Sequence, residues 1–191
     1  MNQIIIDLIN KFEDWINEDK WEDIYISLYD NLDPKFGTGD VVIGEFTKAM
    51  LEARINPLAS DLTYVPNYYA YGLTLGKLEF PKNILSISSS AYADTNGYRE
   101  LYLPGHIDCI NEDAFRGSAV YKVEIEEGCI IIGEGAFADC DNLKEITIPA
   151  SCSFMHDNIF MNSDDVVIRC YRGSRAESYA KEYDIDFEWI D

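Results

Sequence analysis

Short segments in which apolar and polar residues alternate recur through the second half of the chain. They begin at Leu78, Leu101, Val123 and Ile146, so successive starts lie 23, 22 and 23 residues apart. The first and third residues of a β-strand point to the same face. The pattern therefore predicts four short strands whose apolar first and third residues are buried and whose middle residues point outward.

The other apolar positions of each period follow in the same frame. Six residues after the strand starts come Ile84, Ile107, Cys129 and Cys152, and three residues later come Ile87, Ile110, Ile132 and Met155. An aromatic residue preceded by a small or aliphatic one then follows, at Tyr92, Phe115, Phe137 and Phe160, with a weaker upstream match at Tyr68-Tyr69. A three-residue strand cannot bury its apolar face alone, so we expect the copies to stack side by side. We expect each aromatic ring to fill the side of the coil opposite the strands.

Residues 1–57 do not fit this frame and show helical spacing instead. The first predicted helix contains Ile5, Leu8, Ile9, Phe12, Trp15 and Ile16, and the second contains Trp21, Ile24, Tyr25 and Leu28. A loop is predicted from Asn31 to Asp40, and a third helix from Asp40 to about Arg54, ended by Asn56-Pro57. We expect this region to cover the N-terminal end of the repeats. The alternative is that Trp15, Trp21 and their neighbours dock a partner.

The segment from Ile132 to Pro149, IGEGAFADCDNLKEITIP, resembles the BspA-type leucine-rich repeat almost position for position. The resemblance covers about residues 60–191. It implies an α+β protein: a leucine-rich-repeat solenoid of about four repeats of 22–23 residues, with a helical N-terminal region and a helix-strand C-terminal cap. The expected divisions are the helical region 1–57, the repeats 58–165 and the cap 166–191. Glu126 and Ile159 replace the proline and the alanine of the repeat, which predicts local variation in loop geometry.

Residues 166–191 are similar to the C-terminal cap of that family. Ser174 and Glu177 have the spacing of a capping box, which predicts a helix of two to three turns. Ile185, Phe187 and Trp189 then alternate with polar residues as a strand does. Such an ending would cover the last coil, which otherwise exposes apolar surface and a strand edge.

The charge balance restricts the possible partners. The 191 residues include 35 acidic and 15 basic side chains, giving a net charge of −20 that is spread along the chain. Nucleic acids and anionic membranes would repel such a surface, so we expect no direct binding to either. A partner protein with a basic surface is favoured. The N-terminus has no basic region followed by an apolar run, which predicts a cytoplasmic protein, although members of the family are often secreted or surface adhesins.

The candidate reactive residues fit the repeat better than a catalytic centre. Gly133 and Gly135 imitate part of a phosphate-binding loop, but no lysine follows at the required spacing. The five cysteines form no CxxC pair, which argues against a zinc site or a disulfide framework. His106 and His156 lie two repeats apart, so a shared metal site or a Cys-His pair is not expected. The acidic turn residues lack the regular spacing of a calcium loop. We therefore expect no enzyme activity, cofactor or metal.

Function is expected on the surface of the repeats. In leucine-rich-repeat solenoids the outward residues of the stacked strands often bind partners, and the resemblance places Glu79, Tyr102, Glu124, Thr147 and Val167 there. The candidate partner-binding residues are Glu79, Tyr102, Glu124, Glu145 and Thr147. The sequence thus predicts a non-enzymatic protein–protein interaction module that binds through this sheet face or through the helical head. One alternative is an acidic inhibitor, of phage or prophage type, that mimics nucleic acid toward a DNA- or RNA-binding protein. Another is a sheet face that is merely solvated.

Overall fold

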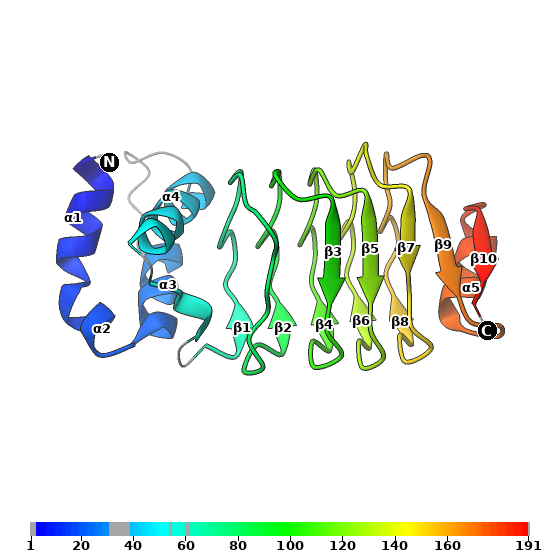
Figure 1. The fold of residues 1–191 in the computed structure, drawn as a ribbon, viewed down its shortest axis with the longest axis horizontal. Helices are drawn as coiled ribbons and strands as arrows, with labels where there is room; N and C mark the ends of the chain where they lie inside the picture. Colours follow the sequence, from blue (N-terminus) through cyan, green and yellow to red (C-terminus); the bar gives the residue numbers. More distant parts are fainter. Residues whose placement is uncertain (1–2, 31–38, 54, 60–61, 191) are drawn as a thin grey trace.

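A computed structural model describes residues 3–30, 39–53, 55–59 and 62–190. Helices form one end of an elongated molecule, stacked coils form its middle, and a helix with a final strand closes the other end (Figure 1). This is the α+β solenoid that the repeat pattern predicts. Among the described residues no helix is long and apolar enough to cross a membrane.

The N-terminal region contains α1 (Gln3–Lys11), α2 (Glu13–Asn17), α3 (Trp21–Asp30) and α4 (Gly39–Glu52), followed by a short 3-10 turn, η2 (Pro57–Ala59). The first predicted helix is therefore two helices, divided at Phe12, whose side chain is buried. Trp21 is also buried, whereas Trp15 stays 37% exposed. The predicted loop falls mostly on residues 31–38, which lie outside the described part of the chain.

The main sheet contains five parallel strands. They are β3 (Glu100–Leu103), β5 (Lys122–Ile125), β7 (Glu145–Thr147), β9 (Val167–Cys170) and β10 (Phe187–Trp189). The predicted inward residues are buried, as Leu101, Val123 and Ile146 illustrate with exposures of 2% or less. The repeat frame therefore identified the inner face of this sheet correctly.

The strand predicted from Leu78 to Phe80 is not formed. Phe80 occupies the repeat position that Leu103 holds in the next coil, but its ring packs edge-to-face on Tyr92, with centroids 5.9 Å apart. Phe80 is only half-buried, whereas Leu103 is 1% exposed, so the Phe80 side chain does not take the fully buried inward position of a strand residue. The main sheet consequently begins at β3.

A second parallel sheet lies along the same coils. Its strands are β1 (Tyr64–Val65), β2 (Ser86–Ile87), β4 (Cys109–Ile110), β6 (Ile131–Ile132) and β8 (Phe154–Met155). The sequence pattern identified the buried second residue of most of these strands but did not predict the strands. Because β1 precedes the first clear repeat, the coils extend further toward the N-terminus than the four predicted copies.

The cap begins with α5 (Arg175–Glu182), whose N-cap is Ser174 as predicted. The Ser174 hydroxyl accepts a hydrogen bond from the Glu177 N–H at 3.2 Å. The Glu177 carboxylate accepts one from the Gly173 N–H at 2.6 Å, one residue earlier than in the usual capping box. Strand β10 then pairs with β9 and extends the main sheet by one strand.

Candidate functional site

The outward side chains of β3, β5, β7, β9 and β10 form one open surface, which we call the sheet face. The strand register arranges them in two rows. The upper row contains Glu100, Lys122, Glu145 and Val167. The lower row contains Tyr102, Glu124, Thr147, Arg169 and Glu188. Adjacent residues of a row can therefore contact the same partner.

The structure brings four of the five candidate residues onto this face. Tyr102, Glu124 and Thr147 are consecutive members of the lower row, and Glu145 lies in the upper row. Glu79 lies outside the sheet because its segment is not a strand, and its carboxylate forms an exposed ion pair with Lys77 at 3.4 Å.

The predicted register of the last outward residue is also corrected. The residue beside Thr147 is Arg169, whereas Val167 pairs with Glu145. The lower row therefore has a basic side chain, Arg169, where an apolar one was predicted.

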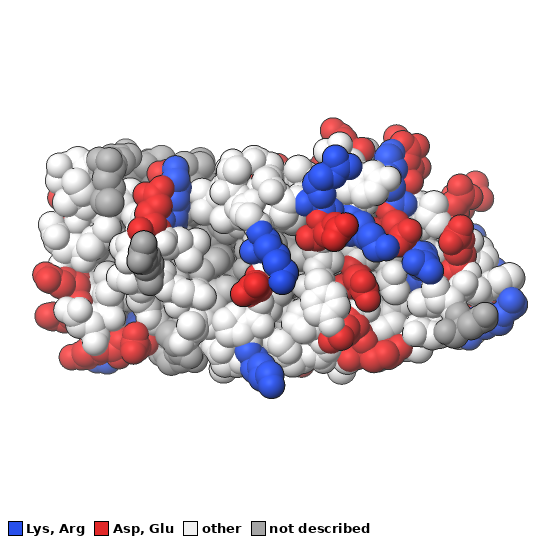
Figure 2. Space-filling view, viewed as in Figure 1, with Lys and Arg blue, Asp and Glu red and all other residues white. Residues whose placement is uncertain are grey.

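Glu145 of the upper row forms one ion pair within that row and a second one with the lower row. The Glu145 carboxylate lies 2.6 Å from the Lys122 Nζ and 3.3 Å from the Arg169 Nη1. The hydrogen bond from Lys122, assisted by the one from Arg169, lowers the pKa of Glu145. Figure 2 shows the resulting mixture of basic and acidic side chains over the upper part of the sheet. The Glu145 carboxylate is therefore already paired with side chains of the same protein.

The lower row borders a hollow of about 420 Å³, which we call the acidic hollow. Its lining consists of Glu124, Ile125, Glu126, Glu127, Thr147, Pro149 and Tyr171. Acidic side chains gather at this lower edge of the sheet in Figure 2. The hollow therefore suits a positively charged group.

The three glutamates of the acidic hollow differ in how far they are engaged. Glu127 accepts hydrogen bonds from the N–H groups of Ala150 and Ser151, at 2.8 and 3.0 Å. Glu126 accepts one from the Gly105 N–H at 2.9 Å, and a hydrogen bond from the Tyr102 hydroxyl, assisted by the one from Gly105, lowers its pKa. Glu124 is exposed, and no residue in the described part of the chain forms a hydrogen bond or ion pair with its carboxylate. Among the three, its carboxylate is the one whose oxygens are both free to accept hydrogen bonds from a partner.

Tyr102 stands beside this carboxylate with 45% of its surface exposed. The hydrogen bond to Glu126, a residue that lines the hollow, raises the pKa of its hydroxyl. An exposed aromatic ring next to an unpaired carboxylate can receive the alkyl stem and the charge of a lysine or arginine side chain.

Sequence reasoning missed Glu126, Glu127 and Tyr171 as neighbours of the site. Glu126 did carry a signal, since it replaces the proline that usually ends the strand, and its carboxylate now binds the preceding coil. Glu127 and Tyr171 lie in turns whose geometry the repeat pattern does not specify.

The described residues contain no group of three or more histidine, cysteine or acidic side chains placed to hold a metal ion. All five cysteines are free thiols, and Cys129, Cys140 and Cys152 are buried where the repeat pattern places core residues. The His106 Nε2 lies 3.2 Å from the Pro81 carbonyl oxygen, as a local contact between coils.

Comparison with protein families agrees with this architecture. The model of the BspA type leucine rich repeat region matches residues 51–167 with six copies, so the repeat region is longer than the four copies that are clear in the sequence. No curated protein and no solved structure matches the chain. Leucine-rich repeats of this kind are in general scaffolds for protein–protein interaction, which agrees with an open sheet face. The chain belongs to the BspA-type leucine-rich repeat family.

Proposed function

We propose that this protein is a non-enzymatic module that binds a basic segment of a partner protein on its sheet face. The observation that carries the proposal is the unpaired Glu124 carboxylate, which stands in the acidic hollow beside the exposed ring of Tyr102. A lysine or arginine side chain fits there because the ring accepts its stem and the carboxylate accepts its charge. Thr147 adds a hydroxyl at the next position of the row.

The division of the chain supports this location. We infer that residues 1–57 and 166–191 cover the two ends of the solenoid, and that the repeats 58–165 carry the binding surface. The five free thiols favour a reducing compartment, so we place the interaction in the cytoplasm. The charge of −20 disfavours nucleic acids and anionic membranes as direct ligands.

The same charge motivates the alternative function, an inhibitor that mimics nucleic acid toward a DNA- or RNA-binding protein. A mimic would act through many spaced carboxylates together, whereas the proposed interaction depends on the carboxylate of Glu124. The two functions differ in one measurable way: loss of one carboxylate hardly weakens a mimic, but it weakens binding that depends on Glu124.

The test is a titration with a short synthetic peptide of alternating arginine and tyrosine, followed by NMR and calorimetry. We expect amide shifts on β3, β5 and β7, and a Kd about fivefold weaker for Glu124→Gln, equivalent to about 1 kcal/mol. Glu79→Gln is the matched control, an exposed glutamate outside the sheet, and we expect it to leave the Kd unchanged. Equal effects of the two variants, or shifts confined to other regions, would overturn the proposal.

A further inference from the structure

Successive coils of the solenoid are joined by hydrogen bonds on the side of the aromatic stack. In each turn, an N–H at or next to the aromatic position donates to a carbonyl of the following coil. These bonds are Ala70 to Ala91 at 2.8 Å, Tyr92 to Ala114 at 2.8 Å, Phe115 to Ala136 at 2.9 Å, and Phe137 to Ile159 at 3.0 Å. The next donor in this series is Phe160.

A second series runs parallel to the first, two residues later in each turn. Its bonds are Gly72 to Ala93 at 2.9 Å, Asp94 to Arg116 at 2.7 Å, Gly117 to Ala138 at 2.8 Å, and Asp139 to Met161 at 2.8 Å. The next donor is Asn162. Within the described part of the chain, neither the Phe160 N–H nor the Asn162 N–H has an acceptor. Both groups point toward the C-terminal end because their equivalents all donate in that direction.

The cap covers the last coil at both sheets, because strand β10 pairs with β9 of the main sheet and α5 packs beside β8 of the second sheet. It does not cover the side of the coil that carries the Phe160 and Asn162 N–H groups. Tyr179 of α5 closes the aromatic stack, with its ring centroid 6.2 Å from that of Phe160, and its hydroxyl accepts the Ile159 N–H at 3.2 Å. A hollow of about 470 Å³ remains there, lined by residues 158, 160, 161 and 163–166 of the last coil and by residues 179 and 183–186 of the cap. We call it the terminal hollow.

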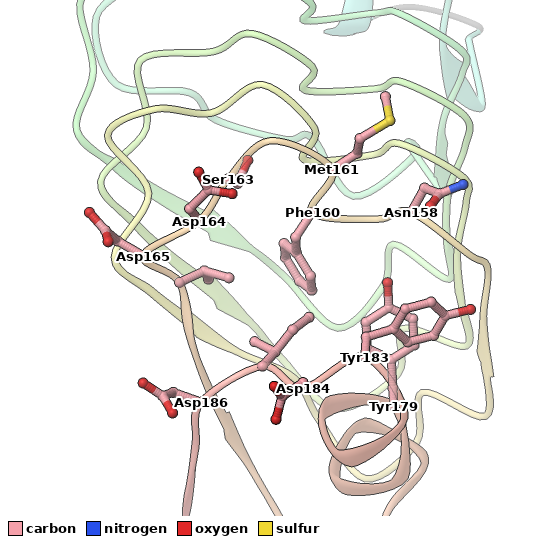
Figure 3. Close-up of a pocket in the computed structure, with 12 residues that line it drawn as sticks. Asn158, Phe160, Met161, Ser163, Asp164, Asp165, Tyr179, Tyr183, Asp184 and Asp186 are labelled. Carbon is pink, nitrogen blue, oxygen red and sulfur yellow. The ribbon is translucent and has the colours of Figure 1, made fainter.

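The terminal hollow combines an apolar floor with an acidic rim. Figure 3 shows Phe160 pointing into it, with Tyr179 and Tyr183 on one side. Asp184 and Asp186 lie on the cap side, and Asp164 lies on the wall formed by the last coil. All three aspartates are exposed. Asp165, by contrast, forms an ion pair with Lys144.

We propose that the terminal hollow binds a segment of a basic protein as if the segment were one more coil, in the turn conformation that the accepting residues of each coil adopt. Two of its carbonyl oxygens, two residues apart, accept hydrogen bonds from the N–H groups of Phe160 and Asn162. A lysine or arginine side chain of the segment reaches Asp184 and Asp186. Peptides that add to an unpaired backbone edge gain affinity from main-chain hydrogen bonds, and side-chain pockets supply the selectivity.

Charge complementarity selects this occupant over a second copy of the chain. A copy carries a charge of −20 and would bring further carboxylates to an acidic rim. A basic segment removes that repulsion and supplies the acceptors that the two backbone donors lack. The site is separate from the sheet face, so the proposal does not depend on the function proposed above.

The first test needs only the free protein. Amide hydrogen exchange followed by NMR compares Phe160 and Asn162 with their equivalents Phe137 and Asp139. We expect the first pair to exchange rapidly and the second pair to be protected, because only the second pair is hydrogen-bonded. Equal protection of both pairs would mean that the donors are not available, and the proposal would be wrong.

The second test adds a short blocked peptide of alternating alanine and lysine, at concentrations up to the millimolar range. We expect the amides of Phe160 and Asn162 to shift and to become protected. A matched peptide of alanine and glutamate is expected to have no effect. No change at these amides with the lysine peptide, or an equal change with the glutamate peptide, contradicts the proposal.

The aspartates are tested by the double variant Asp184→Asn with Asp186→Asn. Loss of two exposed charges is expected to weaken lysine-peptide binding at the Phe160 and Asn162 amides about tenfold, or about 1.4 kcal/mol. Glu124→Gln, on the sheet face, serves as the control and is expected to leave this binding unchanged. If Glu124→Gln weakens lysine-peptide binding and the double variant does not, the peptide binds at the sheet face and the terminal hollow is not a site.

Discussion

Phe115 and Phe137 stack with their ring centroids 5.4 Å apart and their planes 4° from parallel. Tyr92 stacks on the other face of Phe115 with the same spacing and angle, and Phe160 continues the series beyond Phe137 at 6.3 Å. These rings are buried. One continuous aromatic column therefore joins the coils through the interior, and each ring stabilises two neighbours.

The substitution Phe137→Ala removes a fully buried ring from the middle of this column. We expect it to lower the free energy of unfolding by about 3–5 kcal/mol, because it leaves a cavity between two coils. The measurement is urea unfolding followed by circular dichroism. Phe154→Ala is the matched control, since Phe154 belongs to the same region and is 54% exposed. We expect the control to cost about 0.5 kcal/mol or less, and equal costs would contradict the assigned register.

The inner face of the repeats could be predicted from the sequence because each coil repeats the same packing problem. A residue 23 positions away in the chain occupies an equivalent place, so the periodicity alone identifies Leu101 or Phe137 as buried. The failure at Phe80 shows the limit of that reasoning. The pattern identifies an apolar residue at this position, but not that its ring packs on Tyr92 while remaining half-buried.

The candidate site was predicted less completely, for a related reason. Outward residues are under no packing constraint that repeats, so the sequence places Tyr102 and Glu124 on the face without indicating which charges are already paired. Pairing depends on neighbours from adjacent coils, as the contact of Glu145 with Lys122 and Arg169 shows. The N–H groups of Phe160 and Asn162 lack acceptors because of where the cap packs against the last coil. The sequence of a single repeat does not specify that packing.

The ion pairs of Glu145 predict a specific dependence of stability on pH. The pKa of Glu145 lies below its ordinary value of 4.5 because Lys122 and Arg169 stabilise the charged form. The carboxylate therefore stabilises the fold fully above that value, and this contribution is lost as the pH falls through the lower folded-state pKa. At neutral pH we expect Glu145→Gln to reduce the free energy of unfolding by about 0.5–1 kcal/mol.

The measurement compares urea unfolding of the wild type and Glu145→Gln from pH 7 to about pH 3, where carboxylates protonate. We expect the difference between the two proteins to shrink as the pH falls. Glu79→Gln removes a glutamate from an exposed pair outside the sheet and is expected to change little at any pH. A difference that stays constant down to the lowest pH would show that the charge of Glu145 is not the cause.

Gly128 and Gly105 approach each other where two coils turn side by side. Gly128 has a φ of +128°, and a Cβ added there would lie 2.0 Å from the Gly105 carbonyl oxygen. Gly128→Ala therefore meets both backbone strain and a backbone clash, and we expect it to cost about 3 kcal/mol. Gly76→Ala is the control, because a Cβ at Gly76 would meet nothing within 4 Å. If calorimetry gave both variants the same unfolding temperature, the result would contradict the close contact between Gly128 and Gly105.

The cysteines differ in exposure, and alkylation rates can report that difference. Burial raises the pKa of Cys140 to about 11, and Cys140 is fully buried, so its thiolate is scarce and inaccessible. Cys109 is only half-buried, although burial and Asp108 raise its pKa as well. We expect iodoacetamide to modify Cys109 first in the native protein, and the buried thiols of Cys129, Cys140 and Cys152 only after unfolding in urea. Mass spectrometry of digested samples measures the rates, and Cys109→Ser is expected to abolish most native labelling. Native labelling of Cys140 as fast as that of Cys109 would contradict the tight contact between its coil and the next.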